Sequence, residues 1–161
     1  MTQALSALET RNRVIVLVAC SSSKLNTTDM VPAKDLYTGP LFRKSRQYAE
    51  QHANMWGIIS AKYGLLHPDA LVKPYNVTVP PKGTLECLNL ATRISIQLVN
   101  RFGHPGSLVF WPKDITTVVL AGKRYVELMP YYVNAQDPLS GLGIGQRLAW
   151  LNERIGGGLV R

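Results

Sequence analysis

The chain has 161 residues, enough for one domain with a substantial core, and a hydrophobic content of 46% excludes a disordered protein. No apolar run approaches the roughly 20 residues of a membrane-spanning helix, and residues 1–12 carry no secretory signal, so we expect a cytoplasmic protein without a membrane partner. The cysteines and histidines show no metal-ligand spacing, which predicts no metal and no cofactor; these residues are Cys20, Cys87, His52, His67 and His104.

The net charge of +8 favours an anionic partner, and nucleic acid is the first candidate, with DNA preferred to RNA. The charge is unevenly spread, because residues 34–82 hold seven lysines and arginines against three acidic residues. The alternative is that the charge serves only solubility. The oligomeric state stays open.

The first predicted element is a strand over residues 13–19, where an apolar run rich in β-branched residues indicates burial on both faces. A loop over 20–38 and a helix over 40–53 follow, and Pro40 suits the first turn of that helix. We expect one face of this helix to point inward and the other toward water or phosphate: Leu41, Ser45, Tyr48 and His52 inward, and Arg43, Lys44, Arg46 and Gln47 outward.

Further along, a strand over 56–60 is followed by a proline-rich loop over 67–82 and a helix over 84–102. The remaining predicted elements are a strand over 115–120, a short helix over 124–129, a short fourth strand over 131–134 and a last helix over 143–155. Strands that alternate with helices predict a single three-layer α/β domain with a mainly parallel central sheet over residues 13–155. Residues 1–12 and 156–161 are expected to form an N-terminal extension and a flexible tail.

Polar clusters follow the four predicted strands, at residues 20–24, 60–63, 122–125 and 137–140. Ligands of open α/β sheets bind beyond the carboxyl ends of the strands, so we expect the four clusters to meet at one edge of the sheet. The functional hypothesis rests on this convergence.

The cluster after the first strand combines a thiol, three hydroxyls and an amine, from Cys20, Ser21, Ser22, Ser23 and Lys24. Small residues let backbone amides approach a phosphate, although the glycine frame of a P-loop is absent. Lys24 is therefore either an anion holder or, if burial frees its amine, a nucleophile. Cys20 is either a reactive thiol or a packed small side chain.

Asp35 lies too early in the chain to cap the helix that begins at Pro40, whereas Thr38 fits that role. We therefore treat Asp35 as a candidate catalytic partner that orients the Lys24 amine or acts as a general base.

Aromatic and amide side chains near the expected edge are candidates for holding a base, by stacking or by hydrogen bonds to a base edge. They are Tyr37, Tyr63, Tyr75 and Asn76, together with Gly122 and Ser140 at the later clusters. The candidate phosphate contacts are Arg43, Lys44, Lys62 and Lys123. The structural alternatives are an exposed lysine beside a covering tyrosine at 62–63, and a loop stiffened by proline at 73–76.

Five strings resemble a family of small, mostly uncharacterised bacterial and phage proteins over residues 14–151: Cys20–Lys24, Asp35–Lys44, Ser60–Leu66, Pro74–Asn76 and Gly141–Gln146. More distantly, Cys20–Lys24 is similar to an element of archaeosine synthase, a tRNA-modifying enzyme in which the lysine that matches Lys24 bonds the modified base. The chain also resembles the peroxide-stress YaaA family, which binds DNA.

The closing half of the chain resembles uracil-DNA glycosylases, through residues 118–123, then Pro138-Leu139-Ser140, then a helix. This resemblance implies a uracil-DNA-glycosylase-like fold. The chain lacks the histidine of that family's His-Pro-Ser-Pro-Leu-Ser loop, since it reads Gln136-Asp137-Pro138-Leu139-Ser140 there. The water-activating Gly-Gln-Asp-Pro-Tyr motif is also absent after the first strand, so the resemblance implies the fold rather than the mechanism.

The leading hypothesis is an enzyme that acts on a nucleobase or its glycosidic bond in nucleic acid, as a DNA glycosylase or a base-modifying enzyme. The first alternative is a non-catalytic DNA- or RNA-binding protein, which needs the basic surface but no catalytic pair. The second is an N-glycosidase or base transferase that acts on free nucleotides. Product formation, salt dependence and the relative affinity for monomer and polymer discriminate between the three.

Overall fold

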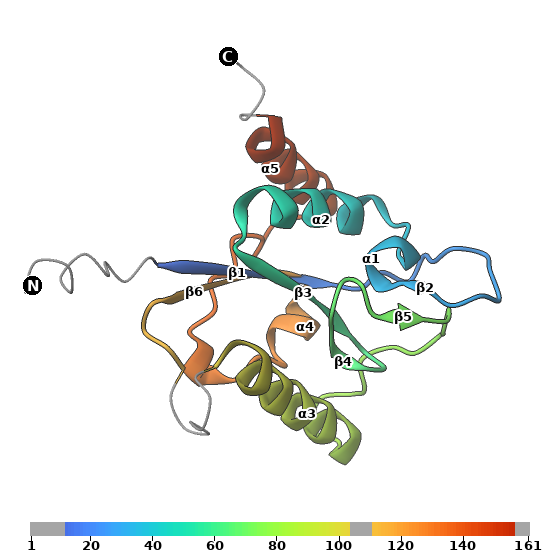
Figure 1. Ribbon diagram of the computed structural model, residues 1–161, viewed down its shortest axis with the longest axis horizontal. Coiled ribbons are helices and arrows are strands. Elements are labelled where there is room, and N and C mark those ends of the chain that lie inside the picture. The colour runs from blue at the N-terminus through green and yellow to red at the C-terminus, as the bar shows by residue number, and fades with distance from the viewer. Residues whose placement is uncertain (1–11, 104–110, 157–161) are drawn as a thin grey trace, which may run out of the picture.

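Strand β1 (Arg13–Ala19) lies inside a four-stranded sheet, as its apolar run predicts. In the computed structural model, which describes residues 12–103 and 111–156, β1 pairs in parallel with β3 (Met55–Ser60) and with β6 (Ile115–Leu120). The outer strand β4 (Gly64–Leu66) runs antiparallel to β3, so the order is β4-β3-β1-β6 (Figure 1). The α/β class and the mainly parallel sheet are confirmed, with an antiparallel edge strand that the sequence did not predict.

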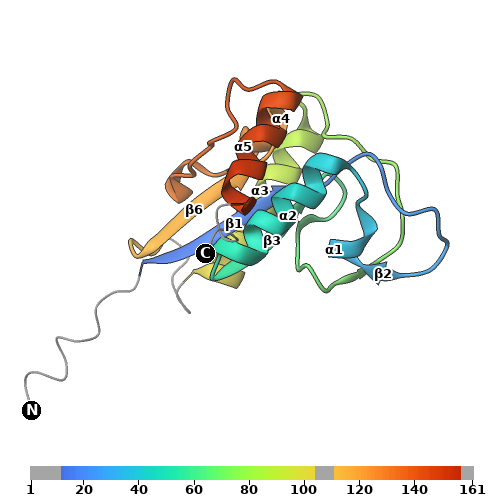
Figure 2. The same cartoon turned by 90° about the horizontal axis from the view of Figure 1, so that it is seen from above.

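Helices cover both faces of this sheet and make three layers. Helices α2 (Pro40–His52) and α5 (Ile144–Gly156) lie over one face, and α3 (Leu85–Phe102) lies over the other (Figures 1 and 2). Side chains of β1 alternate between the two cores, with Val16 and Val18 on the α2–α5 side and Ile15 and Leu17 on the α3 side. Burial on both faces is therefore the physical reason for the unbroken apolar run.

The inward face of α2 differs from the prediction by about one residue. Phe42, Ser45 and Ala49 are buried, whereas His52 is exposed and was wrongly expected to face inward. The helix is packed against α5 as well as the sheet, and Tyr48 meets Trp150 of α5 at a ring-centroid distance of 5.4 Å. The expected cap at Thr38 is also wrong, because Gly39 precedes the helix and no side chain caps it.

On α3 the buried stripe consists of Leu90, Ile94, Leu98 and Phe102. The leucines and isoleucine at positions 85, 88 and 96 belong to the same helix but are exposed. The helix begins with a hydroxyl cap, since Thr84 Oγ1 accepts a hydrogen bond of 3.2 Å from the backbone N–H of Cys87.

Short elements fill the connections that the sequence analysis treated as loops. Strand β2 (Val31–Pro32) pairs antiparallel with β5 (Leu71–Val72), and the short helix α1 (Ala33–Leu36) follows β2. After β6 the chain forms α4 (Lys123–Val126), somewhat earlier than the predicted helix over 124–129.

The predicted strand over 131–134 is wrong, because residues Tyr131–Val133 form a 3₁₀ turn, η1. Asn134 then takes a left-handed conformation with φ of 47°, which ends the turn. The chain pairs with β6 two residues later, through a single bridge at Gln136. There the N–H of Gln136 donates to the carbonyl of Thr117, and the N–H of Val119 donates to the carbonyl of Gln136, both at 2.8 Å.

Parts of three sequence-based expectations lie outside the described residues: the N-terminal extension up to residue 11, His104, and the tail from residue 157. Over residues 12–103 and 111–156, no helix is both long and apolar enough to cross a membrane.

Candidate functional site

Three of the four polar clusters meet at the carboxyl ends of the parallel strands. Cys20, directly after β1, donates its backbone N–H to the carbonyl of Ile59 in β3 at 2.9 Å. Its Sγ lies 3.1 Å from the hydroxyl of Tyr125, which follows β6 in α4. Residues from three separate strand ends therefore share one site, as the parallel arrangement predicts.

A chain of hydrogen-bonded hydroxyls lies at this edge of the sheet, beside the polar clusters. The hydroxyl of Tyr75 lies 2.6 Å from Ser60 Oγ and 2.7 Å from the hydroxyl of Tyr37. Ser60 Oγ also accepts the backbone N–H groups of Lys62 and Tyr63, each at 3.1 Å. Because two amides occupy the acceptor side of Ser60, its proton is directed to Tyr75, so the loop around Tyr75 is tied to the end of β3.

Burial keeps the tyrosine hydroxyls of the site protonated. It raises the pKa of Tyr37 to about 12, with a smaller contribution from the neighbouring Cys20. Burial likewise raises the pKa of Tyr75 and of Tyr125, and the electrostatic effect of the neighbouring Cys20 adds to it. Near neutral pH the three hydroxyls are therefore neutral groups that can donate as well as accept.

Backbone pairing and two aromatic rings hold Lys24 beside this chain of hydroxyls. Residues 23–25 pair with 36–38, since Leu25 N–H donates to the carbonyl of Leu36 at 2.9 Å and Thr38 N–H donates to that of Ser23 at 3.0 Å. Lys24 Nζ lies 4.5 Å from the ring centroid of Tyr75 and 5.7 Å from that of Tyr37. It also donates to the carbonyl of Ser22 at 3.3 Å.

A second lysine approaches the same ring. Lys62 Nζ lies 5.6 Å from the centroid of Tyr75 and 5.1 Å from that of Tyr63, and the rings of Tyr63 and Tyr75 meet edge to face. Ring faces attract an ammonium cation rather than a neutral amine. Lys24 and Lys62 therefore approach the ring of Tyr75 from two separate segments of the chain.

A cavity of about 360 Å³ opens beside these groups. Its wall combines the thiol, amine, guanidinium, amide and hydroxyl groups with two valines; the lining residues are Cys20, Ser21, Ser22, Lys24, Asn76, Val77, Thr78, Val79, Arg124 and Tyr125. This volume is near the lower end of the range of about 300–1,000 Å³ that small-molecule sites occupy. The site thus has room for one small ring system with a few polar contacts.

The structure gives Asp35 a partner other than Lys24, and the expected catalytic pair stays a prediction. Asp35 lies in α1 and pairs through Oδ1 with Nη1 of Arg46 at 2.7 Å. Arg46, expected to face water or phosphate, also binds Glu50 and the carbonyl of Lys34. Asp35 therefore joins α1 to α2.

The other predicted residues divide into two groups. Tyr37, Tyr63 and Lys62 contact Tyr75, and none of these four residues lines the cavity. The remaining predicted residues are not part of its lining either: Ser23, Ser140, Arg43, Lys44, Gly122 and Lys123. Ser21 has a structural role as well, because its Oγ donates to the carbonyl of Ser23 at 2.7 Å and accepts the N–H of Gly39 at 3.3 Å.

Sequence reasoning missed Arg124 and Tyr125, although both belong to the polar cluster that ends β6. They would have been found by giving every residue of that cluster the weight given to Gly122 and Lys123. Asp137 was also missed as a candidate: its Oδ1 is buried and has no hydrogen-bond partner within the described part of the chain. No cluster of three or more potential metal ligands occurs in residues 12–103 and 111–156.

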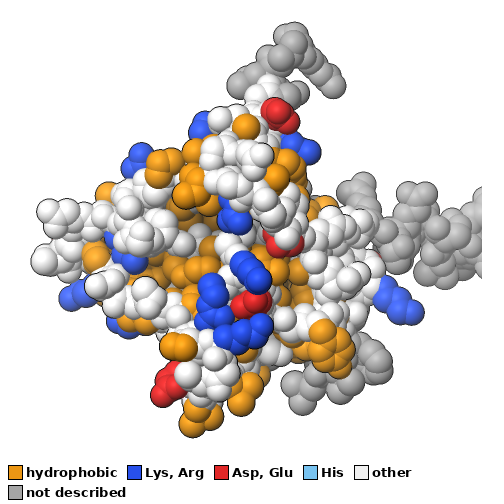
Figure 3. All heavy atoms as spheres, turned by 180° about the vertical axis from the view of Figure 1, so that it is seen from behind, with side chains coloured by type: hydrophobic (Ala, Val, Ile, Leu, Met, Phe, Trp, Pro, Cys, Tyr) orange, Lys and Arg blue, Asp and Glu red, His pale blue; other side chains and the backbone are white. Residues whose placement is uncertain are grey.

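Basic side chains gather beside the cavity around one carboxylate (Figure 3). Glu127 lies 3.5 Å from Lys82 Nζ and 3.1 Å from Arg124 Nη1, and Arg147 of α5 approaches Gly122. We call the four residues Lys82, Lys123, Arg124 and Arg147 the basic rim. One acidic group against four cations leaves this surface positive.

The fold and the site together define an α/β protein with a mainly parallel sheet and a small, cation-lined cavity at the carboxyl edge of that sheet. The chain belongs to the Family of unknown function (DUF6884), whose model matches residues 15–153. It is 32% identical over 132 residues to the Uncharacterized protein YfjM of Bacillus subtilis (strain 168), a match that covers 78% of this chain and 81% of that protein. The sequence-based expectation of an uncharacterised family is thereby confirmed.

Proposed function

We propose that the protein processes a nucleobase in nucleic acid, either by releasing the base or by modifying it. The observation that carries this proposal is the cavity of about 360 Å³ at the carboxyl edge, which combines cationic, amide, hydroxyl and apolar groups. A nucleobase needs these features: apolar walls for its ring and a few donors and acceptors for its edge.

The residues that line the cavity fit distinct parts of such a substrate. Asn76 offers an amide that can both donate to and accept from a base edge, and Val77 and Val79 supply apolar surface. Cys20 and Tyr125 lie against each other on the wall, where the phenol is a neutral donor. A base must leave its stack to enter such a site, as in enzymes that extrude their target nucleotide.

Lys24 then acts as a fixed cation. When a glycosidic bond breaks, negative charge develops on the departing base, and an ammonium placed beforehand stabilises that charge. The same position also suits a phosphate oxygen next to the target nucleotide. Lys24 takes this role through its charge, so a carboxylate partner such as Asp35 is not required.

The basic rim suits the phosphates that flank a bound base. Lysine and arginine contacts to phosphates supply affinity that does not depend on sequence and that falls with added salt. This proposal places Lys123 among the phosphate contacts, as the sequence suggested, and adds Lys82, Arg124 and Arg147.

The chain after β6 also supports a fold like that of uracil-DNA glycosylases as part of this proposal. The bridge at Gln136 continues the sheet, Leu139 is fully buried, and α5 follows. The buried carboxylate oxygen of Asp137 lies within this loop and is a candidate acid or base.

The test is incubation with DNA that carries normal or modified bases, single- or double-stranded, followed by mass spectrometry of released bases and altered nucleosides. Lys24→Ala is expected to lose at least about tenfold in rate, while Lys24→Arg retains a substantial part because the charge persists. Lys34→Ala, which removes a lysine that pairs with Asp69 away from the cavity, serves as the matched control. If Lys24→Arg were as inactive as Lys24→Ala, the amine would be a nucleophile, against our assignment.

A purely binding function is the second candidate, and one observation favours it. Within the described residues, Lys24 Nζ contacts a carbonyl and two neutral rings. None of these groups can act as a general base that activates the amine. Salt-sensitive binding to DNA or RNA with no product from any substrate would support this candidate. Affinity for free nucleotides equal to that for polymer would instead support action on monomers.

A further inference from the structure

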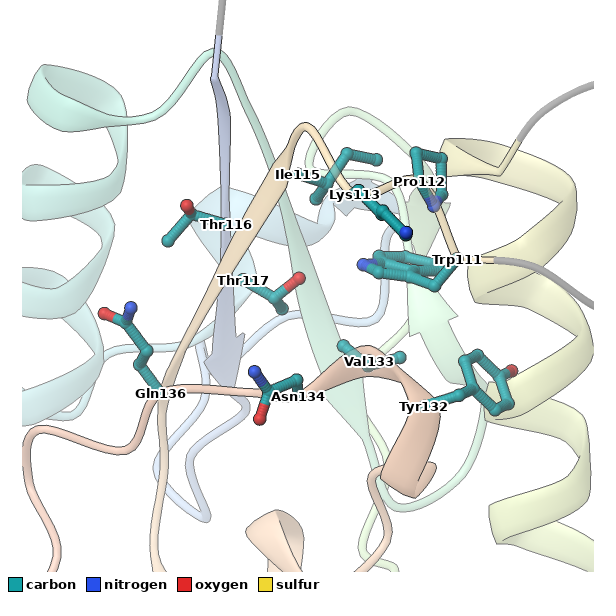
Figure 4. A pocket seen from close by; sticks show the side chains of 10 residues that line it. All are labelled: Trp111, Pro112, Lys113, Ile115, Thr116, Thr117, Tyr132, Val133, Asn134 and Gln136. Atoms are coloured by element: carbon teal, nitrogen blue, oxygen red, sulfur yellow. The ribbon is translucent and has the colours of Figure 1, made fainter.

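A second cavity, of about 390 Å³, lies beside the first half of β6, and it shares no lining residue with the site described above. Its walls come from three segments: residues 111–113, residues 115–117 of β6 and residues 132–136 around η1 (Figure 4). Strand β6 is an edge strand whose outer neighbour is the short bridge at Gln136, so this part of the sheet edge is open to a ligand.

Two buried polar atoms in this cavity have no hydrogen-bond partner among the described residues: Nε1 of Trp111 and Oγ1 of Thr117. Thr117 is only 1% exposed. Figure 4 shows the indole nitrogen and the hydroxyl turned toward each other across the cavity, with Val133 below them and the amide of Asn134 at the side. A buried polar group without a partner costs roughly 1–3 kcal/mol, so two at one place need an explanation.

The hydrogen-bonding chemistry of these groups limits which ligands can bind in the cavity. The indole N–H can only donate, so the ligand must present an acceptor to Trp111. The hydroxyl of Thr117 and the amide of Asn134 can each donate and accept, so they suit a ligand with an acceptor next to a donor. No carboxylate lines the cavity within the described residues, and Lys113 is its only charged lining residue. A cationic ligand is therefore disfavoured.

We propose that this cavity binds a small ring compound through an amide group, O=C–N–H, of the kind found in lactam nucleobases and in nicotinamide. The carbonyl oxygen takes the hydrogen bonds of Trp111 and Thr117, and the adjacent N–H donates to Asn134. The rings of Trp111 and Tyr132, with centroids 6.2 Å apart, provide aromatic surface for the ligand ring. This site is independent of the proposed base-processing site.

The test follows the indole N–H signals of ¹⁵N-labelled protein during titration with nicotinamide and, separately, with uracil. Trp111→Phe identifies the Trp111 signal, and the signals of Trp56 and Trp150 are internal controls. We expect a saturable shift of the Trp111 signal alone with at least one of the two compounds. The compound that binds more tightly shows whether the site prefers the carboxamide of nicotinamide or the lactam of a nucleobase.

Matched variants and analogues test the assigned contacts. Thr117→Val and Asn134→Gly, which keeps the left-handed backbone possible, should each weaken binding about 2- to 10-fold. Thr27→Val is the control, because Thr27 lies in the loop between β1 and β2 and lines neither of the two cavities. Pyridine, which lacks the amide, should give no saturable shift, and nicotinate should bind more weakly than nicotinamide.

Two outcomes would overturn the proposal. Equal affinity for nicotinate or pyridine would show that the amide is not what the cavity recognises. The absence of any saturable shift of the Trp111 signal with either compound would show that the cavity does not bind this class of ring compound.

Discussion

Tyr75 contacts four other residues of the candidate site: Tyr37, Ser60, Lys24 and Lys62. Its hydroxyl joins the end of β3 to the buried Tyr37, and its ring faces both Lys24 and Lys62. One phenol therefore positions two ammonium groups and also closes a hydrogen-bond chain.

Tyr75→Phe is expected to lower the free energy of unfolding by about 1–3 kcal/mol, because it leaves the buried hydroxyl of Tyr37 without this partner. Chemical denaturation measures the change. Tyr131→Phe is the matched control, since Tyr131 is 95% exposed, and it should change stability by less than about 0.5 kcal/mol. Equal effects of the two substitutions would contradict the role assigned to the hydroxyl chain.

The raised pKa of Tyr37 predicts how stability changes at high pH. The unfolded chain ionises this phenol near pH 10, whereas the folded protein holds its pKa at about 12. The folded state therefore binds more protons between these values, and its stability falls as the pH rises from 10 to 12. Urea unfolding at several pH values should show a smaller fall for Tyr37→Phe than for the wild type. An identical fall in both proteins would exclude Tyr37 as a cause.

At the scale of elements, one side chain of α3 makes hydrogen bonds on both sides of the turn at which β4 begins. Oε1 of Gln97 accepts the backbone N–H of Leu65 at 2.7 Å, and Nε2 of Gln97 donates to the carbonyl of Tyr63 at 3.1 Å. Gly64 lies between these two anchors with φ of 75°, and a Cβ at this position would meet Gln97 Oε1. The turn that follows the site is therefore held by a helix from a distant part of the chain.

Gly64→Ala is expected to destabilise the protein by about 2–4 kcal/mol, from the left-handed backbone and from displacement of Gln97, which frees the buried N–H of Leu65. Gly83→Ala is the matched control: its φ is 86°, but nothing lies within 4 Å of the added Cβ. It should cost only about 1–2 kcal/mol. Thermal or urea unfolding gives both values, and equal losses would show that the Gln97 contact contributes nothing.

At the scale of the whole molecule, part of the net charge of +8 lies beside the cavity, in the basic rim. The basic rim lies beside Glu127, while several other cations are neutralised in pairs, such as Arg13 with Asp114 and Lys34 with Asp69. Charge that remains unpaired next to a ligand site attracts an anionic polymer to that site.

If the basic rim contacts phosphates, the double substitution Lys123→Gln and Arg147→Gln should weaken binding of single-stranded DNA and reduce its salt dependence. Each lost contact removes about 0.7 from the slope of log K against log salt concentration, so the slope should fall by about 1–1.5. Fluorescence anisotropy at several salt concentrations measures it. Arg13→Gln with Arg154→Gln, at the start of β1 and near the end of α5, is the charge-matched control and should keep the wild-type slope.

Patterns among residues close together in the chain were sufficient to predict the parallel sheet and part of the candidate site. The apolar run of β1 required burial on both faces, and the polar residues after each strand had to meet once the strands were parallel. Cys20 and Lys24 were predicted in this way, whereas Tyr75 and Asn76 were predicted from their residue types in the proline-rich loop. The family was indicated by the same strings of residues.

Only the tertiary structure decided which side chains meet. Arg46 of α2 forms an ion pair with Asp35, Gln97 of α3 accepts a hydrogen bond from β4, and η1 forms where a fourth strand was expected. Trp111 and Thr117 carry no local signal, because a tryptophan in a loop and a threonine in a strand are ordinary features of any sequence. Their significance arises from the packing of three separate segments that buries both polar atoms around one cavity. Periodicity is a local property of the chain, whereas the partner of each polar group is set by contacts between residues far apart in the sequence.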